Sequence, residues 1–206
     1  MKKIKNIVFD FGGVILTDDD IGVLFDNEEL MSKFPGKEKE FYDSWGKNWK
    51  DVAENRITIF EFYNNLQRDA LGTIDQDLSN HLFETYKNKT HSLDPYMLLP
   101  KLKEKYKLSA LTNIFKEGLE FKINKYKLDT YFDEIVSSCG EGISKADPRI
   151  FKILIKKSGI NPKESLYIDD RDKNIIAAHD LGFEIFKYKE IRELKDKFSE
   201  LGIIYE

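Results

Sequence analysis

Polar side chains stand at the ends of three short apolar segments in this chain of 206 residues. Asp10 follows the first segment. The second segment ends in Thr112 and Asn113, and the third ends in Asp169 and Asp170. In an open α/β sheet, ligands bind just outside the carboxyl ends of the strands. If the three segments are parallel strands of one sheet, their carboxylates and hydroxyl meet at one edge of it.

A lysine is available to join this cluster. Lys145 stands close before Asp147 and Pro148, a pair that is typical of a helix start because Asp caps the first turn and Pro fits the first helical position. The positive end of a helix dipole would then lie beside the lysine. Carboxylate oxygens suit Mg²⁺, and a lysine, a hydroxyl and a metal ion together suit a phosphate group. These residue types therefore predict a site for Mg²⁺ and a phosphate.

Such a site requires parallel strands that are separated by helices. Short apolar runs predict strands at residues 4–9, 107–112, 134–136, 165–168 and 183–186. Helical periodicity appears at residues 96–106, 114–126, 147–158 and 171–181. Strands that alternate with helices indicate an α/β fold, here a Rossmann-like, mostly parallel sheet with helices on both faces.

The region between the strands predicted at 4–9 and 107–112 lacks this alternation for most of its length. Amphipathic helical periodicity appears there in four stretches, residues 20–34, 36–45, 58–70 and 76–88. Pro35, Gly36 and Gly72 punctuate these helices. The simplest architecture is an α/β core of residues 1–17 and 92–206, interrupted after its first strand by a small helical domain of residues 18–91.

Four segments, in their order and spacing, resemble the haloacid dehalogenase-like hydrolases: FDFGGVIL, LSALTN, SKADPRIF and YIDDRDKNIIAAHDLG. Enzymes of that family carry an Asp nucleophile after strand one, then Thr or Ser, a Lys and an acidic pair. The resemblance covers Lys3 to Phe186 and implies that the helical insert is a cap that closes over the site. It also implies a Mg²⁺-dependent phosphatase of a small phosphorylated metabolite. Sugar phosphates are candidates, since some members with a similar FD-x-G-x-V opening hydrolyse them.

The resemblance assigns metal binding and covalent chemistry to four positions. Asp10 would attack phosphorus and become an aspartyl phosphate. Asp10 and Asp170 would hold Mg²⁺ together with the backbone carbonyl of Gly12. Asp169 would bind the metal through a water molecule, or it would hydrogen-bond to the groups that hold the metal.

Other matching positions would hold the substrate. Thr112 and the backbone N–H of Asn113 would bind phosphate oxygens, and Lys145 would offset the charge on the nucleophile and the phosphate. The insert offers further candidate contacts: Arg56 and the aromatic residues Tyr42, Trp45 and Trp49. For these aromatic residues, a spacing of three to four positions is equally typical of a helical core, and Arg56 could be a surface charge.

Gly12 departs from the family pattern. Many phosphatases of the family have Asp at this position, where it protonates the leaving group and later activates water. Loss of a positioned acid or base typically costs on the order of 10² to 10⁴ in rate. A leaving group of low pKa needs less protonation, so sugar 1-phosphates would fit such a site. Asp18, Asp19 and Asp20 could substitute for the acid, or they could form a solvated turn that caps the first helix of the insert.

Three other functions are alternatives to phosphatase activity. A haloacid dehalogenase attacks carbon without a metal and usually has a Ser-rich segment where this chain has Asp169 and Asp170, which argue against it. A sugar phosphomutase normally needs the acid that Gly12 lacks. A non-catalytic binding protein of the same fold would explain Gly12, but not the retention of the other site residues.

Composition limits the partners. Lys and Arg number 33 and Asp and Glu number 37, so the chain carries a net charge of −4 and has no broad basic face for nucleic acid. No stretch approaches the roughly 18 apolar residues of a membrane span. Cys139 is the single cysteine, which points to a reducing, cytoplasmic location. A monomer and a homodimer both remain open.

Overall fold

The computed structural model describes residues 3–17, 28–145 and 147–205. Within them, five parallel strands form one sheet in the order β3-β2-β1-β4-β5. The strands are β1 (Asn6–Phe9), β2 (Lys107–Thr112), β3 (Glu134–Ser137), β4 (Ser165–Asp169) and β5 (Glu184–Lys187). The α/β fold class is therefore confirmed, and every predicted strand is present with ends that differ by at most two residues.

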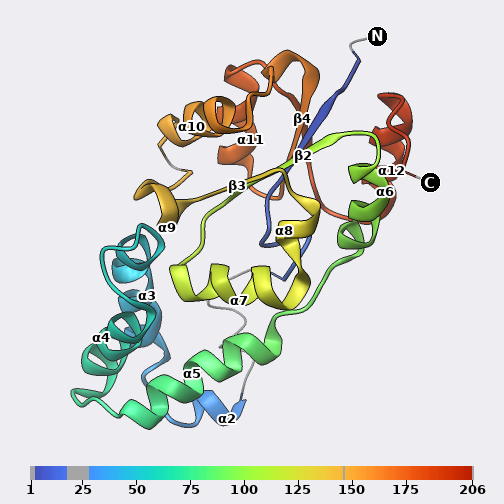
Figure 1. The fold of residues 1–206 in the computed structure, drawn as a ribbon. Helices are drawn as coiled ribbons and strands as arrows, with labels where there is room; N and C mark the ends of the chain where they lie inside the picture. The colour runs from blue at the N-terminus through green and yellow to red at the C-terminus, as the bar shows by residue number, and fades with distance from the viewer. Residues whose placement is uncertain (1–2, 18–27, 146, 206) are drawn as a thin grey trace.

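Helices cover both faces of the sheet, because successive strand side chains point to opposite faces. Ile7 and Phe9 of β1 pack in one apolar cluster with Leu102 of α6 and Phe198 of α12. Val8 belongs to a cluster on the other face, which α10 and α11 cover (Figure 1). The helices of this part are α6 (Leu99–Lys103), α7 (Lys116–Tyr126), α8 (Leu128–Tyr131), α9 (Ser138–Glu141), α10 (Arg149–Ser158), α11 (Asp172–Asp180) and α12 (Ile191–Glu200), with 3₁₀ turns η1 (Asp94–Leu98) and η2 (Pro162–Glu164).

Four further helices gather beyond the carboxyl edge of the sheet (Figure 1). They are α2 (Glu28–Met31), α3 (Glu38–Ala53), α4 (Ile59–Leu71) and α5 (Gln76–Lys89), and their apolar side chains form a third cluster. Local sequence sets the ends of α4. Thr58 and Glu61 form a capping box at its start, and Gly72 ends it with a φ of 72°. We take these helices as the predicted cap, whose limits at residues 18 and 91 remain a prediction.

Three predicted helices differ from the structure. The helix α3 continues past Gly46 to Ala53, because Trp45 and Trp49 stack one turn apart with ring centroids separated by 5.4 Å. The stretch 96–106 is divided between η1 and the short α6, since Pro100 has no N–H to continue the hydrogen-bond ladder. The third, predicted at residues 20–34, is described only from residue 28, where the short α2 already ends at Met31. Its residues 20–27 and the candidate acids Asp18, Asp19 and Asp20 lie outside the described residues.

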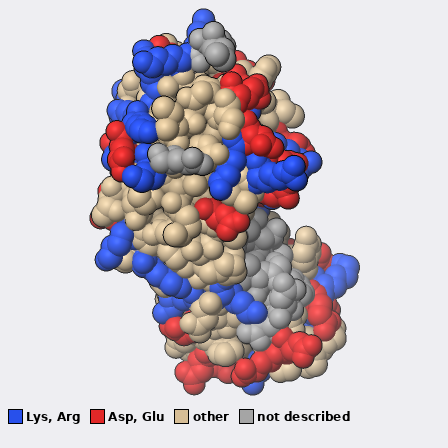
Figure 2. Space-filling model, turned by 90° about the vertical axis from the view of Figure 1, so that its right-hand side faces the viewer, with Lys and Arg blue, Asp and Glu red and all other residues tan. Residues whose placement is uncertain are grey.

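The surface is mixed in charge. On the face drawn in Figure 2, acidic and basic side chains are interspersed over both parts of the molecule. Every helix in the described ranges is too short or too polar to cross a bilayer.

Candidate active site

The strand register brings the predicted site residues to one level. Phe9 of β1 pairs with Ala110 of β2 on one side and with Ile168 of β4 on the other. Asp10 therefore leaves the sheet beside the ends of both neighbouring strands, and its N–H donates to the carbonyl of Ile168 at 2.9 Å. Thr112 ends β2 and Asp169 ends β4, so the polar residues of three strands converge as the sequence predicts.

Lys145 connects two of these strand ends. Its Nζ lies 2.5 Å from Oδ2 of Asp10 and 2.8 Å from Oδ2 of Asp169. All three side chains are buried. Burial disfavours the charge on Lys145, but Asp10 and Asp169 outweigh it and raise the pKa of the lysine above its usual value. Burial also raises the pKa of Asp10, to about 8, with Lys145 opposing it.

Asp169 accepts hydrogen bonds from several neighbouring residues of the site. Its Oδ2 accepts hydrogen bonds from Lys145 and, at 2.6 Å, from the hydroxyl of Tyr167. Its Oδ1 accepts from the backbone N–H of Arg171 at 2.9 Å, and Asn174 donates to both oxygens. Asp169 thus holds Lys145 and the start of α11 in place. Its support of a metal ion stays a prediction.

The three carboxylates of Asp10, Asp169 and Asp170 each offer an oxygen within 4.8 Å of the others. Gly13 makes room for this arrangement. It has a φ of +73°, and a Cβ at this position would lie 2.8 Å from Oδ2 of Asp170. Clustered carboxylate oxygens are the donors that Mg²⁺ prefers, and here Lys145 pairs with Asp10 and Asp169 while Arg171 lies 4.0 Å from Asp170. The donor set therefore fits a divalent cation.

The hydroxyl of Thr112 lies at the same edge of the sheet. It is buried and makes no hydrogen bond to any described residue. Buried polar groups are normally paired, so this hydroxyl fits a hydrogen bond to a ligand such as a phosphate oxygen. The neighbouring Asn113 turns its side chain to the Lys145 loop, where its Oδ1 accepts from the N–H of Lys145 at 2.8 Å.

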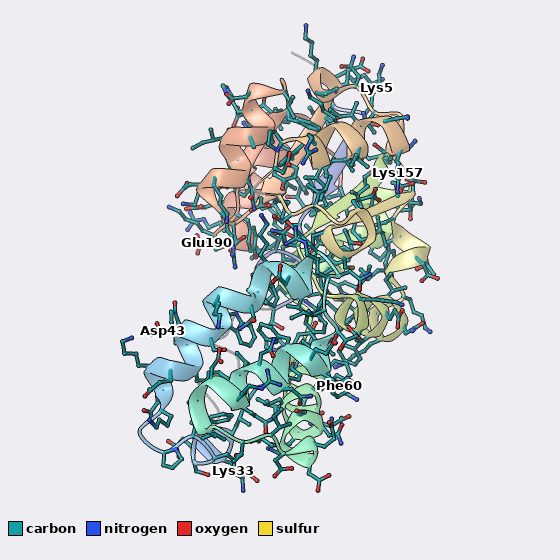
Figure 3. The ribbon with its side chains drawn as sticks, turned by 90° about the vertical axis from the view of Figure 1, so that its left-hand side faces the viewer. Lys5, Lys33, Asp43, Phe60, Lys157 and Glu190 are labelled. Atoms are coloured by element: carbon teal, nitrogen blue, oxygen red, sulfur yellow. The ribbon has the colours of Figure 1, made fainter. Side chains whose placement is uncertain are left out.

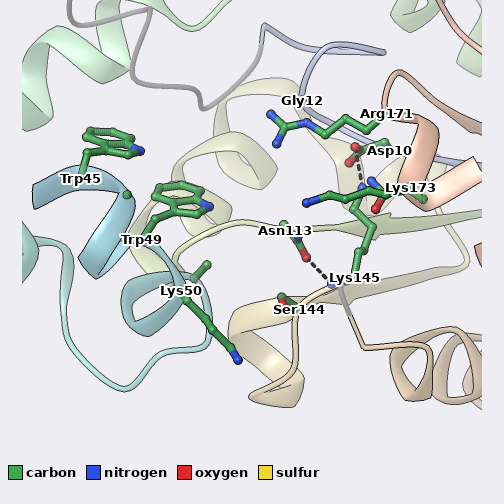
Figure 4. A pocket seen from close by; sticks show the side chains of 13 residues that line it. Asp10, Gly12, Trp45, Trp49, Lys50, Asn113, Ser144, Lys145, Arg171 and Lys173 are labelled. Carbon is green, nitrogen blue, oxygen red and sulfur yellow. Dashed lines mark hydrogen bonds and ion pairs between the residues drawn. The ribbon is translucent and has the colours of Figure 1, made fainter. Parts of the chain in front are cut away.

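A cavity of about 350 Å³ opens over Asp10 and Lys145 (Figure 4). The helix α3 forms one wall of it through Trp45, Gly46, Trp49, Lys50 and Ala53. The opposite wall comes from the sheet edge and from Arg171 and Lys173 at the start of α11. Both tryptophans also pack against Phe62 in the third apolar cluster, so they serve the cavity and the core of the helical layer together.

Two predicted substrate contacts do not reach this cavity. Tyr42 is 58% exposed and lies outside the cavity lining. Arg56 is folded back on its own segment, where it pairs with Glu54 and, at 2.7 Å, with Oδ1 of Asp51. Asn55, with a φ of 56°, makes the turn that directs Arg56 there.

Three cations of the cavity wall were not predicted: Lys50, Arg171 and Lys173. Arg171 and Lys173 directly follow the acidic pair, so their closeness to Asp170 in the sequence was an available signal. Lys50 could be found only if α3 were expected to continue past Gly46.

Comparison with known proteins gives consistent results. The family model for haloacid dehalogenase-like hydrolases matches residues 4–182. The chain is 30% identical over 190 residues to a D-ribitol-5-phosphate phosphatase of Bacteroides thetaiotaomicron, which covers 89% of this chain and 91% of the relative. It is 24% identical over 213 residues to a glyceraldehyde 3-phosphate phosphatase of Methanocaldococcus jannaschii, with coverage of 97% and 92%.

A solved structure shares the fold. The crystal structure of a HAD family enzyme from Bacteroides thetaiotaomicron, as a magnesium complex, superposes with a TM-score of 0.77. The two sequences are 25% identical, and the match covers 96% of this chain and 99% of the other.

Proposed function

The chain belongs to the haloacid dehalogenase-like hydrolases, among their phosphatases, and on that premise we propose that it removes phosphate from a small sugar or polyol phosphate through an aspartyl-phosphate intermediate. The observation that carries this proposal is the buried bridge from Lys145 to Asp10 and Asp169, placed within the cluster of three carboxylates. This arrangement joins a nucleophile, a cation and a set of metal ligands in one site.

Asp10 is the nucleophile. An oxygen of its carboxylate attacks phosphorus, the bond from phosphorus to the substrate oxygen breaks, and water later hydrolyses the acyl phosphate. The backbone N–H of Phe11 donates to Oδ1 of Asp10 at 2.7 Å, and Lys145 holds Oδ2, so the carboxylate is fixed in orientation before the substrate arrives.

The cofactor is Mg²⁺, which both the cluster of carboxylates and the family of the chain support. Asp10 and Asp170 would hold it together with the backbone carbonyl of Gly12, while Asp169 would support the site through its hydrogen bonds to Lys145 and Asn174. When bound, the ion offsets the negative charge of the carboxylates and of the phosphate.

Thr112 and Lys145 bind the transferred phosphate. The Thr112 hydroxyl is buried at the end of β2, and it gains the partner that it lacks among the described residues. Lys145 offsets charge that develops on phosphate oxygens. The N–H of Asn113 contributes a further donor beside Thr112. Arg56 has no part in this proposal, because its guanidinium pairs with Asp51 and Glu54 outside the cavity.

The substrate class follows from the cavity and the relatives. A volume of about 350 Å³ admits a small metabolite, and its wall combines indole rings with lysine and arginine side chains. Such a wall suits a polar, anionic compound. The relatives named above are phosphatases of a five-carbon polyol phosphate and of a three-carbon sugar phosphate, which supports substrates of similar size.

A panel of sugar and polyol phosphates, assayed for phosphate release with Mg²⁺ and with a chelator, tests the proposal. We expect hydrolysis of at least one member that stops when the metal is removed. Release of halide from 2-haloacids that is insensitive to the chelator would instead support the dehalogenase alternative.

A further inference from the structure

A buried carboxylate joins the helical layer to the loop that carries Lys145. Glu54 directly follows the last residue of α3, and its side chain is only 4% exposed. Its Oε1 accepts a hydrogen bond from the backbone N–H of Ser144 at 3.1 Å. Ser144 immediately precedes Lys145, so this contact acts on the backbone of the lysine through a single peptide unit.

Arg56 places a positive charge against Glu54. The guanidinium of Arg56 contacts Oε2 of Glu54 with one nitrogen and Oδ1 of Asp51 with the other. A buried carboxylate is costly unless it is paired and hydrogen-bonded. Here Arg56 supplies the opposite charge and Ser144 supplies the hydrogen bond, so both oxygens of Glu54 have a defined partner.

The Lys145 loop is held from two sides. On the sheet side, the N–H of Lys145 donates to Oδ1 of Asn113, which follows β2. On the helical side, the preceding N–H, that of Ser144, donates to Glu54. Two consecutive backbone N–H groups are therefore fixed by opposite layers of the molecule, and the lysine side chain, which leaves the backbone directly after them, reaches Asp10.

The same helix also shapes the substrate cavity. Figure 3 shows α3 running from the outer region of Asp43 toward the sheet. Trp45, Trp49 and Lys50 line the cavity along this path, and Glu54 follows where the helix ends. A displacement of α3 would move the cavity wall and the acceptor of Ser144 together.

We propose that Glu54 is a positioning residue that couples the cavity wall of α3 to Lys145. By holding the N–H of Ser144, it aligns the lysine with Asp10 when α3 is seated against the sheet. This inference rests on the proposed function, since only there does Lys145 act on phosphate. Lys145 would stabilise charge in the transition state, so its misplacement should lower kcat more than it raises KM.

Three variants separate the hydrogen bond from the charge. Glu54→Gln keeps an oxygen that can accept from Ser144 but loses the charge opposite Arg56. Glu54→Asp keeps the charge but is one methylene too short to reach Ser144 from the same backbone position. Glu54→Ala loses both. A matched control is Asp69→Ala, because Asp69 of α4 accepts a hydrogen bond from Ser44 of α3 at 2.8 Å and does not line the cavity.

We expect Glu54→Ala and Glu54→Asp to lower kcat about 10- to 100-fold, as misplaced catalytic groups do, with a smaller change in KM. Glu54→Gln should recover most of the rate, and Asp69→Ala should leave kcat unchanged even if it lowers the melting temperature. A full rate in Glu54→Asp, or a Glu54→Gln variant no better than Glu54→Asp, would overturn the inference. The comparison of Glu54→Asp with Glu54→Gln still tests the inference if Glu54→Ala does not fold.

Amide hydrogen exchange tests the coupling without any activity. Exchange at Ser144 should accelerate in Glu54→Asp and remain slow in Glu54→Gln and Asp69→Ala. If the wild-type protein hydrolyses no phosphate ester, the proposed function fails while this measurement still decides whether Glu54 holds the loop. Unchanged exchange at Ser144 in Glu54→Asp would refute that role.

Discussion

The Nζ of Lys145 lies 2.5 Å from Oδ2 of Asp10, and both groups are almost fully buried. Neither residue would be tolerated there alone, because an unpaired buried charge is strongly destabilising. Asp169 completes the arrangement on the other side of the lysine. Removal of Lys145 should therefore destabilise the fold, which makes the pairing testable in the absence of substrate.

Replacement of Lys145 by Met should destabilise the protein by about 3 to 5 kcal/mol, because it leaves buried carboxylates without their partner. Mg²⁺ should recover part of this loss by neutralising the same carboxylates, while phosphatase activity stays abolished. Denaturant unfolding with and without Mg²⁺ measures both effects. The control is Lys157→Met, which removes an exposed pair with Glu141 and should cost less than about 1 kcal/mol. Equal losses in the two variants would contradict the account.

Substitution of Gly13 by Ala should weaken Mg²⁺ binding. The added Cβ would lie 2.8 Å from Oδ2 of Asp170 and would displace that carboxylate. Gly159→Ala is a matched control, since Gly159 has a similar φ of +63° with nothing within 4 Å of the added Cβ. Both variants should lose about 1 to 2 kcal/mol of stability from the left-handed backbone. Only Gly13→Ala should need more Mg²⁺ for half-maximal activity, and equal Mg²⁺ requirements would exclude the role given to Asp170.

The Thr112 hydroxyl should matter for phosphate but not for folding. It makes no hydrogen bond to a described residue, so Thr112→Val should leave the free energy of unfolding unchanged or slightly raised. The loss of a hydrogen bond to a charged group, about 1.5 to 3 kcal/mol, should weaken inhibition by inorganic phosphate by at least tenfold. Ser109→Ala is the control, because Ser109 is equally buried and unpartnered among the described residues but lies deeper in the same strand. Similar inhibition constants in both variants would rule out phosphate binding at Thr112.

Gly12 predicts a steep dependence of rate on the leaving group. A positioned acid donates a proton as the bond breaks and so flattens this dependence. Without one, negative charge builds on the departing oxygen, and aryl or anomeric phosphates should outrun alkyl phosphates of similar size. The series should be compared by kcat/KM under conditions where the chemical step is limiting. A flat series would mean that another group protonates the leaving oxygen.

The sheet and the central site could be predicted from sequence because their signals are local. The apolar run of β2 was expected at residues 107–112, as it is found, and the polar residues that follow each strand mark the edge where ligands bind. The resemblance to a known family then supplied roles for Asp10 and Lys145. Both kinds of signal lie within a few residues of the sequence.

The wall of the cavity depended on tertiary contacts and was predicted less well. The helix predicted at residues 36–45 continues to Ala53, with Trp45 stacked on Trp49, and so brings Lys50 to the cavity. The sequence left Arg56 as either a substrate contact or a surface charge, and only the turn at Asn55 reveals that it pairs with Glu54 and Asp51. No local sequence pattern predicts the direction in which such a turn points a side chain.

The turnover of Asp10→Asn tests the central claim most directly. The amide has nearly the shape of the carboxylate but cannot attack phosphorus, and Lys145 keeps Asp169 as a charged partner at 2.8 Å, so the variant should still fold. With the best substrate of the panel and saturating Mg²⁺, we predict a folded protein that releases no phosphate above the uncatalysed rate. Phosphate release by the folded variant at the wild-type rate would contradict the aspartyl-phosphate mechanism.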